Sequence, residues 1–334
     1  MLANIVSRPG SSRFPSWLLP AAGYAVSIAC LIWVYRGFDW SGEWRRIKAT
    51  DWSWVTLAVA GDLTVYVCMG WRWHMLLRPL SRISLRRTVQ AIYIGLFANE
   101  VLPLRTGEVI RCYLVSRWGN LPFPAALSSA VIERLMDGFW LMIGVYLASS
   151  FVTLPRWFID GSRALTVLIL VLAVLVVAAV IRRSQAHRAV AENRFGAWLR
   201  NVVDAVHLMG RSPSFAGAMV LSFFYLALQV LPIWALMEGY GLRLGVWHAA
   251  VVMVVVRLGG VPPQAPGNVG SVQAMAVLVL TLFGVDRPEA TGFATLLFVV
   301  VTVPLWLAGF LALMLTRMRL VDIRQAAEDH MNGR

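Results

Sequence analysis

The chain consists mainly of long apolar runs separated by short polar segments. Six runs are long enough for an α-helix, which rises about 1.5 Å per residue, to cross a hydrocarbon core of about 30 Å. They are Trp17–Tyr35, Trp52–Leu77, Pro122–Phe151, Ala164–Ile181, Phe215–Met237 and Glu289–Leu315. The pattern predicts an all-α polytopic membrane protein with about six full spans.

Two further apolar regions, Thr88–Arg117 and Val246–Val285, are interrupted by proline, glycine and polar residues. The interruptions in the two regions are at Asn99, Pro103 and Gly107, and at Pro262, Pro263, Pro266, Gly267 and Gln273. Backbone groups freed at such breaks need protein, water or ligand as partners. Each region therefore predicts two half-length helices that meet at a break, as in a re-entrant hairpin or a discontinuous helix.

Lysine and arginine are distributed unevenly around the apolar runs. If each interrupted region enters and leaves on one side, most of the thirty basic residues lie on the side of the two termini. Cytoplasmic loops carry the excess of Lys and Arg, so both termini are predicted to be cytoplasmic. The halves, about 17–158 and about 163–317, then have opposite orientations, as in an inverted-topology repeat. The alternative is six spans plus two ordinary kinked spans without symmetry.

Composition supports a single membrane domain over residues 1–334. The residues AVILMFWYC make up 59% of the chain, charged residues make up 14%, and the mean hydropathy is +0.68. Soluble domains are only about half apolar. The net charge of +13 is carried by basic residues that flank apolar runs, so it indicates anionic lipid rather than nucleic acid. We expect a multi-pass protein of a bacterial-type cytoplasmic (inner) membrane.

The segment about 185–210 is polar, with apolar residues at helical spacing. It predicts an amphipathic helix on the cytoplasmic face of the membrane. A plain linker is the alternative.

The first interrupted region carries Arg105, Glu108 and Arg111 at intervals of three. On a helix that begins after Pro103, these charges lie along one side, where the carboxylate can hold the two guanidinium groups. A helix N-terminus adds partial positive charge there. The array suits a phosphate or carboxylate, so Arg105 and Arg111 are predicted to bind a lipid head group.

Other charged residues fall inside apolar runs, where each charge is costly unless it has a partner or a wet cavity. Glu133 and Asp137 are four residues apart on one face, with Arg134 beside them; they indicate either a buried salt-bridge network or substrate contact. Asp62 and Arg72 are close to three helical turns apart, so either can pair with these charges. Arg257 is the cation beside the second interruption, and we predict that it also binds the head group.

Catalytic and cofactor motifs are missing from the sequence. It contains no HExxH, GxSxG or Walker A motif, and no acidic metal cluster. The three cysteines lie in or beside different apolar segments without a CxxC pair. We therefore expect no metal, no cofactor and no enzymatic activity.

The chain resembles the flippase-like transmembrane region of the lysylphosphatidylglycerol synthase family. The resemblance is carried by NEVLPLRTGEVIRCYLVSR at 99–117, ERLMDGFWL at 133–141, PPQAPGNVGSVQA at 262–274 and, more weakly, WRWHMLL at 71–77. It implies a polytopic domain that moves a lipid between leaflets. Gln273 stands where the family pattern usually has Glu, and Asn268 replaces its second Gly. The aminoacyl-transfer domain of two-domain members is absent, so we expect a stand-alone member that does not synthesise lysylphosphatidylglycerol.

The leading functional hypothesis is a lipid flippase or transporter for a phospholipid, glycolipid, polyprenyl-linked lipid or hopanoid. Its partner would be a lipid with an anionic or zwitterionic head group. One alternative is an accessory or scaffold protein for a lipid-biosynthesis enzyme. The other is an intramembrane transferase, which the missing motifs disfavour.

Overall fold

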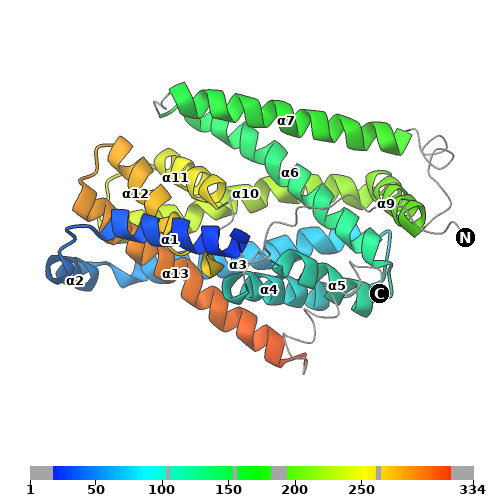
Figure 1. The fold of residues 1–334 in the computed structure, drawn as a ribbon, viewed down its shortest axis with the longest axis horizontal. Coiled ribbons are helices and arrows are strands. Elements are labelled where there is room, and N and C mark those ends of the chain that lie inside the picture. Colours follow the sequence, from blue (N-terminus) through cyan, green and yellow to red (C-terminus); the bar gives the residue numbers. More distant parts are fainter. Residues whose placement is uncertain (1–17, 103–105, 153–155, 182–193, 261–264, 317–334) are drawn as a thin grey trace, which may run out of the picture.

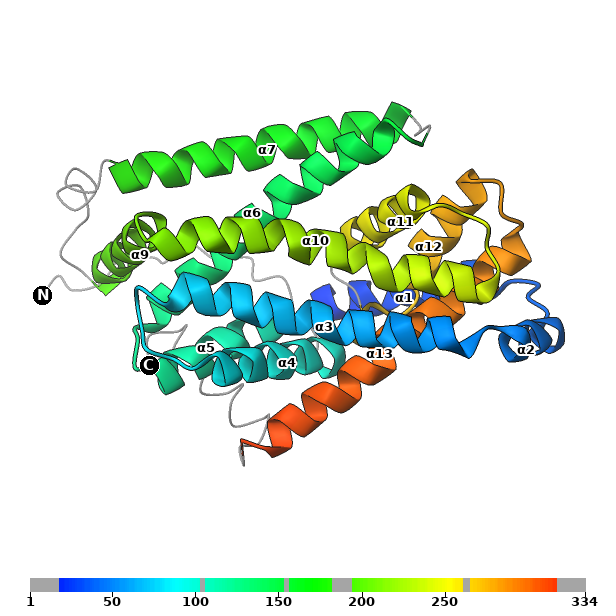
Figure 2. The same ribbon diagram turned by 180° about the vertical axis from the view of Figure 1, so that it is seen from behind.

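The computed structural model describes residues 18–102, 106–152, 156–181, 194–260 and 265–316. This part of the chain is entirely helical, with twelve α-helices and a short 3-10 helix, η2 (Figures 1 and 2). The elements are α1 (Leu18–Tyr35), α2 (Trp40–Ala49), α3 (Trp52–Leu77), α4 (Leu85–Val101), α5 (Gly107–Gly119), α6 (Phe123–Ser149), α7 (Arg156–Ile181), α9 (Arg194–Gly210), α10 (Pro213–Tyr240), α11 (Val246–Gly259), η2 (Pro266–Asn268), α12 (Ser271–Leu282) and α13 (Arg287–Met314). The all-α prediction is confirmed.

The six predicted spans correspond to α1, α3, α6, α7, α10 and α13. Among the described residues, α3, α10 and α13 are long and apolar enough to cross a membrane, and α1 with α2, bent by 83°, brings the number to as many as four. Every 18-residue stretch of α6 contains Glu133, Arg134 and Asp137, whereas the spanning stretches of α3, α10 and α13 contain at most two charged residues. The number of spans stays a prediction.

Helices α3 and α10 lie side by side and run across the middle of the face that Figure 2 shows. They are antiparallel, because Gly61 near the middle of α3 faces Leu231 and Pro232, while Gly217 at the start of α10 faces Met75 at the end of α3. Small residues let helix backbones approach closely in membrane proteins. This pair supplies one wall for most of the polar groups described below.

The first interrupted region folds into α4 and α5, which pack against each other as an antiparallel pair. A Cβ atom on Gly107 would lie 1.8 Å from the carbonyl oxygen of Gly95, so the two backbones touch where both residues lack a side chain. The Asn99 Oδ1 atom accepts a hydrogen bond from the Gly107 backbone N–H at 2.8 Å. The polar residue at the break therefore satisfies the first free donor of α5. Pro103 and Arg105 lie outside the described residues.

The second interrupted region folds in a similar way into α11, η2 and α12. Gly259 at the end of α11 packs on Met275 near the start of α12, and His248 near the start of α11 contacts Phe283 just after α12, so these two helices are also antiparallel. Gly267 and Gly270 have φ angles of 72° and 88°, in the left-handed region that glycine favours. The Gln273 Oε1 atom accepts a hydrogen bond from the Gly270 N–H at 2.8 Å and caps α12. Pro262 and Pro263 lie outside the described residues.

The remaining helices surround this arrangement. Helix α7 lies along one edge of the molecule, where it packs on α6 and α9 and exposes a run of apolar side chains that suits lipid (Figure 1). Of the predicted amphipathic segment, only α9 is described; its Val203, Ala205 and Met209 are buried and the helix packs mainly on α6. Helix α2 exposes Trp40 and Trp44, as expected of a helix at a membrane interface.

Candidate functional site

Arg72 of α3 is a fully buried charge, with no exposed side-chain surface. Its Nη2 atom contacts Glu133 Oε1 at 2.6 Å, and its Nη1 atom donates to Asp137 Oδ1. Both carboxylates come from α6, where their four-residue spacing places them one turn apart on the face toward α3. The guanidinium plane also lies over the Tyr225 ring of α10, 4.4 Å from its centre.

Arg111 of α5 joins the same carboxylate from the other side. Its Nη1 atom lies 2.7 Å from Glu133 Oε2, and its Nη2 atom lies 2.9 Å from Glu108 Oε2. The guanidinium lies 4.6 Å from the ring centre of Trp73, the residue after Arg72. Glu133 therefore bridges two buried arginines, one from α3 and one from α5.

Arg134 connects the remaining two carboxylates, Glu108 and Asp137, on the more exposed side of this group. Its Nη2 atom lies 2.9 Å from Glu108 Oε1, and its Nη1 atom lies 3.3 Å from Asp137 Oδ2. The result is a closed ring in which Arg and acidic side chains alternate, which we call the charge ring. Its members are Arg72, Glu133, Arg111, Glu108, Arg134 and Asp137.

The charge ring contains three cations and three anions, so its formal charge is zero. Each guanidinium contacts two carboxylates and each carboxylate contacts two guanidinium groups, which offsets the cost of removing these charges from water. A complete ring is a strong connection between α3, α5 and α6. It has little positive charge left over for an additional anion.

The charge ring includes one of the predicted head-group residues, Arg111, and the acidic residue expected to hold it, Glu108. Glu108 was expected to hold Arg105 and Arg111; in the described chain it contacts Arg111 and Arg134. Arg105 lies outside the described residues. A role for Arg111 in head-group binding stays a prediction, although both ends of its guanidinium already contact carboxylates.

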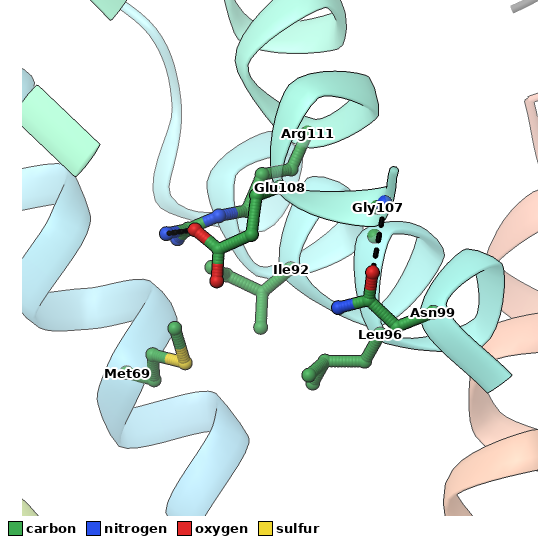
Figure 3. A pocket seen from close by; sticks show the side chains of 8 residues that line it. Met69, Ile92, Leu96, Asn99, Gly107, Glu108 and Arg111 are labelled. Carbon is green, nitrogen blue, oxygen red and sulfur yellow. Dashed lines mark hydrogen bonds and ion pairs between the residues drawn. The ribbon is translucent and has the colours of Figure 1, made fainter. Parts of the chain in front are cut away.

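A small pocket lies between α3, α4 and α5 beside the charge ring, lined by polar groups of the first break and by apolar side chains such as Met69 and Leu96 (Figure 3). Asn99, Glu108 and Arg111 supply its polar lining. Its cavity volume of about 10 Å³ is about the space that a single water molecule needs. In this conformation the pocket fits a small polar group or water rather than a whole lipid.

A second polar group lies between α3, α10 and α11, and we call it the polar cluster: Asp62, Tyr66, Tyr225, Gln229 and Arg257. Arg257 ends α11 at the second break, and its Nη2 atom donates to the Tyr225 hydroxyl at 3.4 Å. Its charge acts on Asp62, and Tyr66 is in electrostatic range of Asp62, Tyr225 and Arg257. Asp62 and Arg72, close to three turns apart on α3, thus belong to two different polar groups, and Tyr225 contacts both groups.

The two interrupted regions meet each other. Glu100, at the end of α4, packs so closely on Gly267 that a Cβ atom there would lie 2.8 Å from Glu100 Oε2. The same oxygen accepts a hydrogen bond from Trp306 Nε1 of α13 at 3.2 Å. Glu100 is also in electrostatic range of Tyr66, so the meeting point of the breaks adjoins the polar cluster.

Sequence reasoning missed the aromatic and amide members of these groups. Trp73, Tyr225 and Gln229 lie in apolar runs, where aromatic residues usually face lipid or the core. Gln229 had a usable signal, because it is a polar amide inside a 28-residue apolar helix. Among the described residues, no group of three His, Cys, Asp or Glu side chains is arranged to hold a metal ion.

Comparison with known proteins connects this architecture with membrane lipids. Residues 21–309 match the family described as the lysylphosphatidylglycerol synthase TM region. Two proteins of Methanothermobacter thermautotrophicus, each named UPF0104 membrane protein, are 24% and 20% identical to the chain. The alignments cover 74% and 75% of this chain and 79% and 81% of the relatives. A shorter match, 33% identical over 84 residues, is to the glycosyltransferase AglD of Haloferax volcanii and covers 24% of this chain and 14% of that protein. The chain is therefore an integral membrane protein that belongs to the lysylphosphatidylglycerol synthase transmembrane-region family.

Proposed function

We propose that this protein moves a lipid between the leaflets of a bacterial-type cytoplasmic membrane. The observation that carries the proposal is the contact between the two interrupted regions, where Glu100 of the first lies against Gly267 of the second. Discontinuous helices that meet at mid-membrane are the usual position of a transporter's substrate site. Membership of a lipid-associated family agrees with a lipid substrate.

The same contact supports the inverted arrangement of the two halves. If α4 and α5 form a re-entrant pair entered from the cytoplasm, and α11 and α12 one entered from outside, the two tips meet near the middle of the bilayer. Six full spans, cytoplasmic termini and an amphipathic segment on the cytoplasmic face complete this topology. Opposite halves of this kind give alternating access by rocking against each other.

Within this mechanism, the head group is held by cations near the breaks while the tails stay in lipid. Arg257 is the stronger candidate among the described residues. There, the arginines of the charge ring form ion pairs with carboxylates, whereas Arg257 donates a hydrogen bond to the Tyr225 hydroxyl. Arg105 is its counterpart in the first region by sequence position. The charge ring fixes α5 beside α6 and α3, and so positions the first break.

The proposal is tested by reconstituting the purified protein in liposomes that contain lipids with a fluorescent acyl chain. A membrane-impermeant quencher then reports how fast labelled lipid reaches the outer leaflet. We expect wild-type protein to accelerate exchange, and Arg105→Ala and Arg257→Ala to reduce it. The matched control is Arg163→Ala, which removes an exposed arginine of α7. Exchange equal to that of protein-free liposomes, with and without an ion gradient, would contradict the proposal.

The partial match to a glycosyltransferase favours a second candidate, a membrane region that assists a lipid-modifying enzyme. In that case, the purified protein alone would not move lipid, and it would co-purify with the enzyme. Deletion of α9 would then abolish the association, because a dock of this kind requires the amphipathic helix.

A further inference from the structure

Two acceptor atoms of the polar cluster have no donor among the described residues. They are Asp62 Oδ2 and Gln229 Oε1, and each residue is only 6% exposed. Buried polar atoms are almost always hydrogen-bonded in folded proteins, since an unpaired acceptor loses its water without replacement. The charge ring, by contrast, pairs all of its carboxylates. The other buried side-chain atoms without a partner among the described residues are Nε of Arg72 and of Arg111, the Thr106 hydroxyl and three imidazole nitrogens. Asp62 Oδ2 and Gln229 Oε1 are therefore the carboxylate and amide oxygens of this group, and a ligand that supplies donors would satisfy both.

The helices bring these two acceptors to the same level. Gln229 Nε2 donates to the Tyr225 carbonyl at 3.1 Å, so Gln229 lies one turn after Tyr225 on the same face of α10. On the antiparallel α3, Gly61 faces Leu231 and Pro232, which places Asp62 beside the turn of α10 that contains Gln229. The Tyr225 hydroxyl, one turn away, receives the hydrogen bond from Arg257.

The cluster therefore offers one carboxylate, one amide oxygen and one guanidinium. Its two opposite charges match a ligand that itself carries one positive and one negative charge. The acceptors need N–H or O–H donors, while the guanidinium suits a phosphate, to which arginine binds with charge-assisted hydrogen bonds. A purely anionic head group would leave Asp62 without a counter-charge.

We propose that the polar cluster binds the zwitterionic head group of a phospholipid with a primary amine. The ammonium group donates hydrogen bonds to Asp62 Oδ2 and Gln229 Oε1, and the phosphate contacts Arg257. This inference rests on the proposed function and narrows its substrate to one class. Asp62 then contributes to recognition through its charge, while the charge ring remains a structural connection.

The test measures lipid binding to the purified full chain in detergent, by native mass spectrometry with phospholipids of identical acyl chains. The probes are phosphatidylethanolamine, phosphatidylcholine and phosphatidylglycerol. The first two are both zwitterions, but the trimethylated nitrogen of phosphatidylcholine has no N–H donor. We expect phosphatidylethanolamine to bind about tenfold more tightly than either of the others, as one charge-assisted hydrogen bond provides.

The variants Asp62→Asn and Gln229→Leu test whether the preference for phosphatidylethanolamine depends on the polar cluster. We expect each to reduce the preference for phosphatidylethanolamine, and Asp160→Asn, at an exposed carboxylate of α7, to retain it. A melting temperature measured for each variant identifies any variant that fails to fold. If both variants fail to fold, the lipid preference of the wild-type protein alone tests the inference. Equal binding of phosphatidylethanolamine and phosphatidylcholine, tighter binding of phosphatidylglycerol, or a preference unchanged in both folded variants would overturn the inference.

Binding and transport separate this inference from the proposed function. If the protein moves the amine and choline lipids equally well in liposomes, the inference is contradicted but the proposed transport function still holds. If the protein binds phosphatidylethanolamine selectively but does not move lipid, the transport function is contradicted. The binding site for an amine lipid is then still supported.

Discussion

The charge ring predicts an unusually large effect for a substitution that hardly changes shape, Glu133→Gln. Glu133 contacts Arg72 at 2.6 Å and Arg111 at 2.7 Å through its two carboxylate oxygens. A glutamine keeps one oxygen and turns an NH₂ group toward the other guanidinium. One buried arginine thereby loses a carboxylate, and the ring acquires a net positive charge.

The magnitude follows from burial. Glu133 and Arg72 have no exposed side-chain surface, and Arg111 is 4% exposed, so water does not replace the lost partner. Removal of one member of a buried ion pair costs about 3–5 kcal/mol. An exposed pair is worth about 0–1 kcal/mol, which makes Asp160→Asn, beside Arg163 on α7, a matched control.

The assay is the free energy of unfolding in mixed micelles, titrated with a denaturing detergent. We expect Glu133→Gln to lose about 3–5 kcal/mol and Asp160→Asn to lose less than about 1 kcal/mol. The double variant Glu133→Gln with Arg72→Met removes the excess positive charge of the ring and should recover part of the loss. If Glu133→Gln and Asp160→Asn are equally stable, the reasoning about the ring is wrong.

Three further predictions concern packing, topology and pH. Gly107→Ala should destabilise the protein by about 3 kcal/mol, because its Cβ would overlap the Gly95 carbonyl; Gly161→Ala, with open space around it, should be neutral or slightly stabilising in the same unfolding titration. In a cysteine-free background, Arg87→Cys should react with an impermeant thiol reagent only from the cytoplasmic side and Arg243→Cys only from outside; labelling of both from one side contradicts the inverted arrangement. The Ser41 hydroxyl and the backbone N–H groups of Gly42 and Ser41 lower the pKa of Asp39, which caps α2, below 3.8. Its contribution is therefore present at neutral pH and is lost as the pH falls through that lowered pKa, so the stability difference between wild type and Asp39→Ala should shrink as the pH falls below 3.8.

The sequence predicted the positions of the helices well because each long apolar run has one way to satisfy its backbone in a membrane. It also predicted both interrupted regions from their proline and glycine residues. It predicted that Glu133 and Asp137 share a face, since that depends only on local spacing. Local spacing within one helix does not indicate which other helix packs against its charged face.

The full set of partners of each charge therefore could not be predicted, although the expected pairing of Arg72 with Glu133 and Asp137 is present. Glu108 contacts Arg111, as expected, and also Arg134 of another helix, which the spacing within α5 could not indicate. Asp62 and Arg72 are close to three turns apart on α3, yet α6 engages only Arg72. The contact between Glu100 and Gly267 joins residues far apart in the chain, and a glycine at a break gives no sign of what packs on it.

The charge ring also has a consequence for how the chain is made. Helix α6 carries Glu133, Arg134 and Asp137 in its middle, so it is a poor candidate for insertion alone, at a cost of about 2.5–3.5 kcal/mol for a central charge. Its ring partners Arg72, Glu108 and Arg111 all lie earlier in the chain and emerge first from the ribosome. They can therefore be waiting in or beside the insertion machinery when α6 arrives. The order of the residues along the chain thus makes the first half of the protein a folding unit for α6, and deletion of residues 52–119, which include Arg72, Glu108 and Arg111, should leave α6 outside the bilayer.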